Sequence, residues 1–275
     1  MMKFVPILMY HSVSQQADSR YHRWCVSPQR FEQHMSVLAN GGYNVLTISD
    51  LVDQMTSNIP LPSHCVALTF DDGLQDFITD AAPVLKRFGF PATLYVVAGH
   101  IGQKSAWLSN LGEGSRPMLK ESELRKLVDQ GIEIGGHSMN HPELDILSTD
   151  EAMFEIRESR IELERIIGQP IRTFAYPHGY ASKITRNLTR DAGYSSAVRV
   201  CHALSTPGEN IYGLSRLIIT EEFDDHAFLN LIQGHHVPIA PKQKRLAADC
   251  WRIARRVRKW HDQKFARHSN AIALK

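Results

Sequence analysis

The hydrophobic and polar positions of this chain change period repeatedly between residues 4 and 234. Short apolar runs that end in polar residues predict buried strands, and apolar residues spaced three and four apart predict helices. The predicted strands cover residues 4–11, 43–47, 65–70, 92–99, 132–137, 171–176, 195–200 and 214–220. The predicted helices cover residues 27–42, 49–55, 77–90, 120–131, 148–168, 182–193 and 225–234.

Local start and stop signals support several of these helices. Ser27 precedes Pro28, which suits the first helical position. Ser148 and Glu151 have capping-box spacing, and a glycine follows the helix that they open. Residues 100–118 are rich in glycine and are predicted to form a loop.

Strands and helices alternate with short connections, which predicts an α/β fold with a parallel sheet. Seven or so such units favour a closed or nearly closed barrel over a short open sheet. An open doubly wound sheet is the structural alternative at this stage. We therefore expect one domain over residues 1–241 and a separate C-terminal segment over residues 242–275.

Composition places the chain among ordinary globular proteins, with 43% hydrophobic and 22% charged residues. The opening MMKFVPILMYHSV has a short apolar run broken by Pro6 and lacks a small-residue cleavage site, so we expect no signal peptide. The four cysteines lie far apart and predict reduced thiols. Together these features predict a cytoplasmic protein, with a peripheral position at the inner membrane face as one option.

The charge is divided unevenly between the two parts of the chain. Residues 242–275 hold eleven basic and two acidic residues, a net charge of +9, whereas residues 1–241 carry a net charge of −7. Apolar residues recur every three or four positions in this tail, at Leu246, Cys250, Ile253, Val257 and Trp260. The pattern predicts a basic amphipathic helix. It would either dock its apolar stripe on the barrel, the reading we prefer, or bind an anionic membrane surface. Nucleic acid is not expected as a partner, because no binding motif accompanies the charge.

Four polar clusters directly follow predicted strands. They are Tyr10-His11, Asp71-Asp72-Gly73, the HSMNH segment from His137 to His141, and Pro177-His178-Gly179. In a parallel barrel the carboxyl ends of the strands gather at one face, where active sites lie. Segments distant in sequence are therefore expected to converge there.

The residue types in these clusters point to a divalent metal. Two histidines and one aspartate are a reasonable ligand set that leaves positions for water and substrate. One of Asp71 and Asp72 would bind the cation and the other would act as a base, and the cation would lower the cost of two adjacent charges. Taken singly, the aspartates also suit an ordinary turn, and His11, His137 and His141 could be unremarkable surface or packing histidines.

The combination of TFDDG, HSMNHPEL and a strand ending in YPHG resembles the polysaccharide deacetylase family, also called the NodB-homology domain or carbohydrate esterase family 4. The resemblance spans Phe4 to Gly234. It implies a distorted (β/α) barrel with about seven parallel strands. It also implies an enzyme that removes acetyl groups from N-acetylated sugars with a divalent metal, most often Zn²⁺. The expected partner is thus an N-acetylated saccharide.

Carried over position by position, the resemblance makes Asp72, His137 and His141 metal ligands and Asp71 the general base. The Pro177-His178-Gly179 segment matches the family's oxyanion loop, where the His178 backbone N–H would hold the oxyanion. The opening PILMYH resembles the branch that includes poly-N-acetylglucosamine deacetylases, which makes His11 the general acid.

Two departures from the family pattern affect the expected site. Ala175 stands where the family often has an arginine that orients the base, so Arg199 and Arg216 on late strands are the candidates for that support. Either one could instead be an ordinary structural arginine. The family's late Leu-x-His acid is also absent from its usual spacing. Two alternative functions follow: a carbohydrate-binding homologue with impaired catalysis, and an amidohydrolase for a non-sugar amide.

Overall fold

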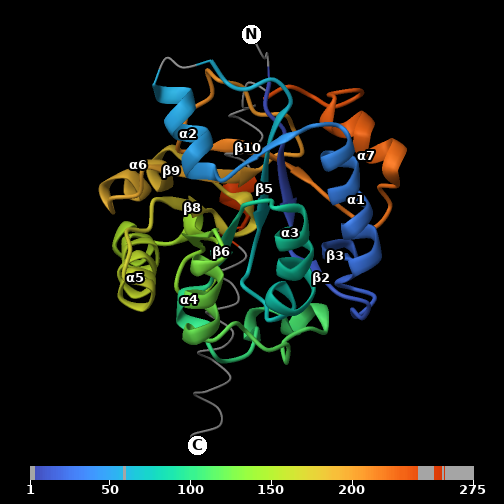
Figure 1. Cartoon of the computed structure of the whole chain (residues 1–275). Coiled ribbons are helices and arrows are strands. Elements are labelled where there is room, and N and C mark those ends of the chain that lie inside the picture. The colour runs from blue at the N-terminus through green and yellow to red at the C-terminus, as the bar shows by residue number, and fades with distance from the viewer. Residues whose placement is uncertain (1–3, 58–59, 241–250, 256, 258–275) are drawn as a thin grey trace, which may run out of the picture.

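Parallel strands form a closed ring in the computed structural model, which describes residues 4–57, 60–240, 251–255 and 257 (Figure 1). The ring runs β1-β10-β9-β8-β7-β6-β5 and closes because β1 also pairs with β5. A further strand, β4, pairs with β5 beside the ring. The strands are β1 (Ile7–Tyr10), β4 (Asn44–Leu46), β5 (Cys65–Phe70), β6 (Ala92–Val96), β7 (Ile132–Gly136), β8 (Thr173–Ala175), β9 (Ser196–Val200) and β10 (Leu214–Ile218).

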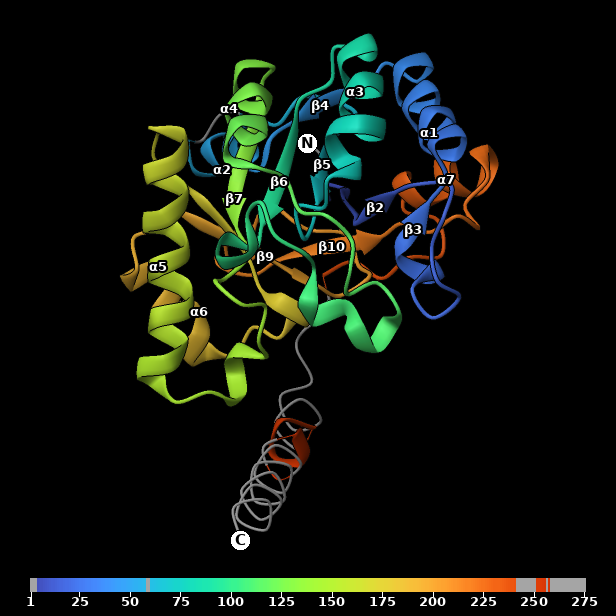
Figure 2. The ribbon, with the colours of Figure 1, turned by 90° about the horizontal axis from the view of Figure 1, so that it is seen from below.

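Helices cover the outside of this ring, as the view along it shows (Figure 2). They bury one face against the strands and expose the other, as their amphipathic sequences require. The helices are α1 (Pro28–Asn40), α2 (Ile48–Thr56), α3 (Ala82–Phe88), α4 (Glu121–Asp129), α5 (Thr149–Ile167), α6 (Lys183–Asp191) and α7 (Asp225–Ile232). The predicted distorted barrel of about seven parallel strands is therefore confirmed, and the open-sheet alternative is wrong.

Closure of the ring depends on the pairing of β1 with β5. Ile7 lies opposite Ala67, and Tyr10 lies opposite Phe70, so both strands end at the same level. Every residue of β5 is buried, which explains why its sequence is a continuous apolar run with no alternation. The residues that follow these two strands are consequently neighbours at one end of the barrel.

The structure refines several of the predicted elements. The helix predicted over 77–90 begins as a π-helical turn, η2 (Phe77–Ala81), before α3, with Pro83 near the start of α3. The predicted loop 100–118 contains a 3-10 helix, η4 (Ala106–Leu111). A two-residue parallel pair, β2 (Ser12–Val13) with β3 (Cys25–Val26), was not predicted, because so short a pairing leaves no periodic signal.

Most of the predicted basic tail lies outside the described residues, including Leu246, Cys250 and Trp260. We had preferred a tail whose apolar stripe packs against the barrel, and at the described positions of the tail this prediction is wrong. Ile253 and Val257 are each 59% exposed, whereas Arg255 is 3% exposed. Asp145 accepts two hydrogen bonds from the Arg255 guanidinium at 2.8 and 2.6 Å. A basic residue of the tail, rather than its apolar stripe, therefore contacts the barrel here.

No disulfide joins Cys25, Cys65 and Cys201, which are the cysteines of the described part of the chain, and Cys250 lies outside it. Among the described residues, none of the helices combines the length and the apolar character needed to cross a bilayer.

One core histidine leads to a prediction about acid stability. His34 on α1 is fully buried and stacks on Phe228 with ring centroids 4.2 Å apart. Its two ring nitrogens contact the Tyr10 hydroxyl and the Phe223 carbonyl, which satisfies a neutral imidazole. Burial lowers the pKa of His34 to about 4.

The free energy of unfolding is therefore expected to fall on acidification through this histidine. Below the unfolded pKa of about 6.5 the unfolded chain binds a proton that the folded chain refuses until about pH 4, which costs roughly 3 kcal/mol across that range. Urea unfolding between pH 7 and pH 4.5 should show a shallower loss of stability in His34→Gln than in the wild-type protein. Equal pH slopes in the two proteins would contradict the assignment.

Candidate active site

Backbone hydrogen bonds between strand ends bring three of the four polar clusters together. The Asp71 N–H donates to the Tyr10 carbonyl and the His137 N–H donates to the Val96 carbonyl, each at 3.0 Å. The Val97 N–H donates to the Asp72 carbonyl at 3.3 Å. The segments that follow β1, β5, β6 and β7 are thus joined at the carboxyl end of the barrel, where parallel strands deliver their last residues.

Three side chains in this cluster can hold a metal ion. His137 Nε2 lies 3.8 Å and His141 Nε2 3.6 Å from Asp72 Oδ1. The three ligand atoms all lie within 4.8 Å of one another. Asp72 and His137 are almost fully buried, and His141 is slightly more exposed. The residues present therefore fit a divalent cation bound by two imidazoles and one carboxylate.

The surroundings of His137 and His141 fix their orientation and their protonation state, as metal binding requires. The Ala175 carbonyl lies 2.8 Å from His137 Nδ1, which assigns the proton to Nδ1 and turns the lone pair of Nε2 toward Asp72. The His141 N–H donates to Ser138 Oγ at 2.9 Å, which fixes the turn between the histidines. Burial lowers the pKa of both imidazoles, so both are in the neutral form that binds metals.

The electrostatic environment of Asp72 also favours a cation. Burial raises the pKa of Asp72 to about 8, and the neighbouring Asp71 and Asp76 carboxylates add to this effect. Three buried carboxylates thus influence one another, and a divalent cation would favour their ionised forms. This fit comes from the chain's own charges and supports a metal between Asp72, His137 and His141.

Asp71 has a different environment from its neighbour. The fully buried Arg216 guanidinium donates to both Asp71 carboxylate oxygens, at 2.6 and 2.7 Å. The same guanidinium donates to Thr69 Oγ1 at 3.1 Å, which holds it against the barrel wall. Burial by itself would raise the pKa of Asp71, but the Arg216 charge outweighs this effect and holds the pKa at about 2. Asp71 is therefore an ionised carboxylate in a fixed orientation.

The two arginines considered from the sequence occupy different sites. Arg216 lies on β10 and contacts Asp71 through the barrel interior, whereas Ala175 on β8 has no side chain that could do so. Arg199 on β9 points elsewhere and donates to Glu209 and to Ser215 Oγ. Arg216 is thus placed to orient Asp71, and Arg199 is not.

His11 lies beside the carboxylates but has a low basicity. Its ring packs against Trp24 with centroids 4.6 Å apart. Burial lowers the pKa of His11 to about 4, although the nearby Asp71 charge acts in the opposite direction. The sequence suggested an imidazole that is protonated near neutral pH, whereas this environment favours the neutral ring.

The Pro177-His178-Gly179 segment forms a tight turn next to the histidine cluster. The His178 and His141 ring centroids are 4.7 Å apart. His178 has a φ of 58° and Gly179 a φ of 77°. A Cβ on Gly179 would lie 2.5 Å from Val200 Cβ, so only glycine fits this position.

Positive backbone angles are concentrated at this site. Asp72, Ser138, His141 and His178 are four of the seven non-glycine residues with positive φ in the described part of the chain. Such conformations cost about 1–3 kcal/mol each and persist where the surroundings impose them, commonly at functional sites. The backbone is therefore held in the geometry that presents these side chains and the His178 N–H.

Two supporting residues were not identified from the sequence. Glu155 on α5 is buried, and it accepts hydrogen bonds from the Met139 and Asn140 N–H groups, each at 2.9 Å. A signal existed, because Glu155 is a charged residue on the buried stripe of an otherwise ordinary amphipathic helix. Trp107 in η4 stacks on the His141 ring with centroids 5.5 Å apart, and a tryptophan inside a predicted loop gives no such signal.

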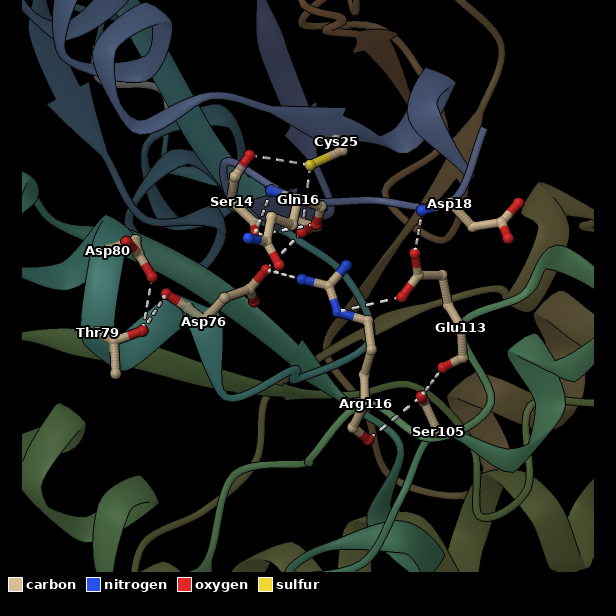
Figure 3. Close-up of polar contacts among 11 residues, drawn as sticks. Ser14, Gln16, Asp18, Cys25, Asp76, Thr79, Asp80, Ser105, Glu113 and Arg116 are labelled. Atoms are coloured by element: carbon tan, nitrogen blue, oxygen red, sulfur yellow. Dashed lines mark hydrogen bonds and ion pairs between the residues drawn. The ribbon is translucent and has the colours of Figure 1, made fainter. Parts of the chain in front are cut away.

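A second polar network is centred on Asp76 and Arg116 (Figure 3). Arg116 donates to Asp76 Oδ2 at 2.7 Å and lies 3.7 Å from Glu113 Oε2, as the close-up shows. Ser12 donates to the same Asp76 oxygen, and burial raises the pKa of Asp76 to about 6. This network connects the start of η2 to the loop before α4 and to the segment after β1, all of which border the site.

Comparison with known proteins agrees with this fold and site. A family profile described as Polysaccharide deacetylase matches residues 58–197. YxkH of Bacillus subtilis strain 168, whose name assigns it to the polysaccharide deacetylases, is 29% identical over 224 residues, which cover 82% of this chain and 74% of YxkH. The poly-beta-1,6-N-acetyl-D-glucosamine N-deacetylase of Staphylococcus aureus strain MRSA252 is 23% identical and covers 74% of this chain and 70% of its own length.

Solved structures show the same fold. The Streptococcus pyogenes deacetylase PplD, in complex with acetate, superposes with a TM-score of 0.73 at 24% identity and covers 83% of this chain and 98% of its own. IcaB from Ammonifex degensii gives a TM-score of 0.71 at 22% identity, over 85% of this chain and 98% of its own.

The barrel and the carboxylate–histidine cluster define the class as an α/β-barrel hydrolase. The chain belongs to the polysaccharide deacetylase family. It is accordingly a hydrolase of carbon–nitrogen bonds other than peptide bonds.

Proposed function

We propose that the protein is a metal-dependent N-deacetylase that removes acetyl groups from an N-acetylated amino sugar in a polysaccharide, an oligosaccharide or a lipid-linked glycan. The observation that carries the proposal is the unequal environment of two adjacent carboxylates. Asp71 is held by Arg216, whereas Asp72 faces His137 and His141. One carboxylate is thus fixed as an anion that accepts protons, and the other is available to a cation.

Each of the chain's own groups has a role in amide hydrolysis. A bound divalent cation would supply Lewis-acid activation of the acetamide carbonyl and of a water molecule. Asp71 accepts the proton of the attacking water, and Arg216 keeps that carboxylate in place. The His178 N–H stabilises the negative charge that develops on the carbonyl oxygen. His11, which is neutral before the reaction, would take up the proton that Asp71 removes from the water and pass it to the leaving amine.

Zn²⁺ is the metal that this ligand set favours. Two neutral imidazoles and one carboxylate form a catalytic zinc site when further positions remain for water and substrate. Hard cations such as Mg²⁺ prefer sites made of oxygen ligands. The proposal therefore includes zinc as the native metal.

Acetate release tests the proposal directly. The purified protein is analysed for metal content and then incubated with N-acetylated glycans, with their deacetylated forms as blanks. We expect acetate and new amines in equal amounts, loss of both after chelation, and recovery with Zn²⁺. Glycan binding without acetate release would favour a carbohydrate-binding homologue. Release from simple acetamides alone would favour the amidohydrolase for a non-sugar amide.

Replacement of His11 tests the proposed acid. His11→Ala is expected to retain its metal and lose about 10²–10⁴-fold in activity, because general acids contribute on that scale. Because burial lowers the pKa of His11 to about 4, the basic limb of the wild-type kcat/KM that reports this acid should lie near pH 4 rather than near pH 6.5, and it should be absent in the variant. Metal analysis and pH–rate profiles of both proteins provide the measurement, and a fully active variant would remove His11 from the mechanism.

The proposed location is the cytoplasmic face of an anionic membrane, reached through residues 242–275. The tail carries a net charge of +9, and its described residues Trp251, Ile253 and Val257 are each more than half exposed. Exposed apolar side chains together with basic residues suit an interfacial helix, and each Lys or Arg near such a surface is worth about 1 kcal/mol.

Co-sedimentation with vesicles tests this location. The full chain is expected to bind phosphatidylglycerol vesicles at low salt and to dissociate at high salt. Ile253→Ser/Val257→Ser should weaken this binding without changing the fold, because both side chains are exposed. If the wild-type protein does not sediment with the vesicles, the membrane proposal is wrong.

A further inference from the structure

A cleft of about 790 Å³ opens beside the turn that carries His178. Gly179 and Tyr180 form the wall nearest the candidate active site, and Val200 at the end of β9 lies opposite Gly179. One face of α6 forms another wall, and Trp251 of the tail borders the opening. Its volume is within the range of small-molecule sites, and its position adjoins the reacting centre without being part of it.

The charges that line this cleft are almost all positive. Six of its lining residues are basic, whereas Asp145 is the acidic one. The basic residues are Lys183, Arg186, Arg190, Arg199, Arg252 and Arg255. A concave surface with one sign of charge concentrates ions of the opposite sign.

Several of these charges are already compensated. Arg190 pairs with Asp191, Arg199 pairs with Glu209, and Arg255 pairs with Asp145. In contrast, neither Lys183 nor Arg186 makes an ion pair within the described part of the chain. The cleft therefore keeps a net positive charge after its internal pairs are formed.

Arg199 provides a second and independent observation. It is 8% exposed, and its Nε is buried without a hydrogen-bond partner among the described residues, although its Nη2 is used by Glu209 and Ser215. A buried guanidinium nitrogen without an acceptor is costly. Arg199 Nε is thus an unsatisfied donor that lies within the wall of the cleft, beneath its surface.

We propose that this cleft binds a phosphate group carried by the N-acetylated substrate. Guanidinium groups match phosphate oxygens in geometry and charge, and several cations are needed where the ligand carries more than one negative charge. Trp251, which is 53% exposed, supplies an aromatic surface next to these cations against which a sugar ring can pack, whereas the Arg255 guanidinium covers one face of the Tyr180 ring. The proposal rests on the proposed function and narrows its substrate class to phosphorylated or diphosphate-linked saccharides.

Binding measurements separate this proposal from catalysis. The metal-loaded full chain is titrated with inorganic pyrophosphate and with N-acetylglucosamine 1-phosphate, and methyl N-acetylglucosaminide serves as the uncharged comparison. We expect both phosphate compounds to bind at least about tenfold more tightly than the uncharged sugar, and to weaken as salt increases. Equal affinity for the charged and uncharged sugars would overturn the proposal, whether or not acetate is released.

Variants locate the binding to the cleft. Lys183→Gln/Arg186→Gln is expected to weaken binding of both phosphate compounds at least about tenfold and to leave the uncharged sugar unaffected. Arg165→Gln, an exposed arginine on α5 outside the cleft, is the matched control and should bind as the wild-type protein does. Unchanged phosphate binding in the double variant would overturn the proposal.

A competition experiment distinguishes a phosphate on the saccharide from a phosphate in a lipid headgroup. Phosphatidylglycerol vesicles are added in competition with N-acetylglucosamine 1-phosphate. Retention of the sugar phosphate in the presence of vesicles supports a soluble or glycan-borne phosphate in the cleft. Binding of vesicles by the Lys183 and Arg186 side chains, with no binding of either phosphate compound, would show a lipid-headgroup site and overturn the proposal.

Discussion

Alanine at Asp72, His137 or His141 is expected to remove the bound metal and to reduce acetate release by on the order of a thousandfold. The three ligand atoms lie within 4.8 Å of one another, so the loss of any one leaves two ligands. Lewis-acid stabilisation is worth several kcal/mol, which corresponds to that loss in rate. Elemental analysis and acetate assays of the purified variants provide the measurement.

Stability and specificity controls are needed for this series. His226→Ala replaces an exposed histidine on α7 and should retain both metal and activity. Asp72→Ala also removes a carboxylate that burial makes costly to ionise, so the metal-free variant is expected to stay folded. Full metal occupancy in any of the three ligand variants would exclude that residue from the site.

Asp71→Asn is expected to keep its metal and to lose about 10²–10⁴-fold in kcat, because an amide cannot take the proton from water. The near-isosteric change leaves the Arg216 charge without its anion, and breaking such a buried pair costs about 3–5 kcal/mol of folding free energy. Activity should therefore be compared well below the melting temperature of the variant. Metal loss in Asp71→Asn together with metal retention in Asp72→Asn would show that the two roles are reversed.

The partner of Asp71 provides a test through pH. In the wild-type protein the Arg216 charge outweighs burial and holds the pKa of Asp71 at about 2, so the base remains ionised throughout the usual assay range. Arg216→Met removes that charge, after which burial raises the pKa. The acidic limb of kcat/KM should then move to higher pH, with loss of activity beginning nearer neutrality. An acidic limb that stays in place would mean that Arg216 has only a structural role.

The sequence was sufficient for the barrel and for most of the residues that converge on the site. Apolar runs such as Cys65–Phe70 indicate buried strands, and stretches with apolar residues every three or four positions indicate helices. Both signals depend only on residues that are close together in the sequence. The polar clusters directly after such runs predicted which side chains meet, because parallel strands deliver their ends to one face.

Only the tertiary structure decided between the two late arginines. Arg199 and Arg216 look alike in sequence, each within an apolar strand. Arg199 pairs with Glu209, which lies in the connection to the next strand, whereas Arg216 pairs with Asp71, which follows a strand in the first third of the chain. Such pairing depends on which face of the strand points into the barrel, and strand register sets that face.

For the basic tail, too, the sequence predicted some features and only the structure showed the others. Its charge and amphipathic period were evident from the sequence, but the face that meets the barrel was not. Hydrophobic pattern favoured burial of Ile253 and Val257, whereas the structure buries Arg255 against Asp145, with the guanidinium 3.6 Å from the centre of the Tyr180 ring. The hydrophobic pattern of the tail indicates which of its side chains could be buried. Which of them are buried depends on the barrel surface that the tail meets, and residues distant in sequence form that surface.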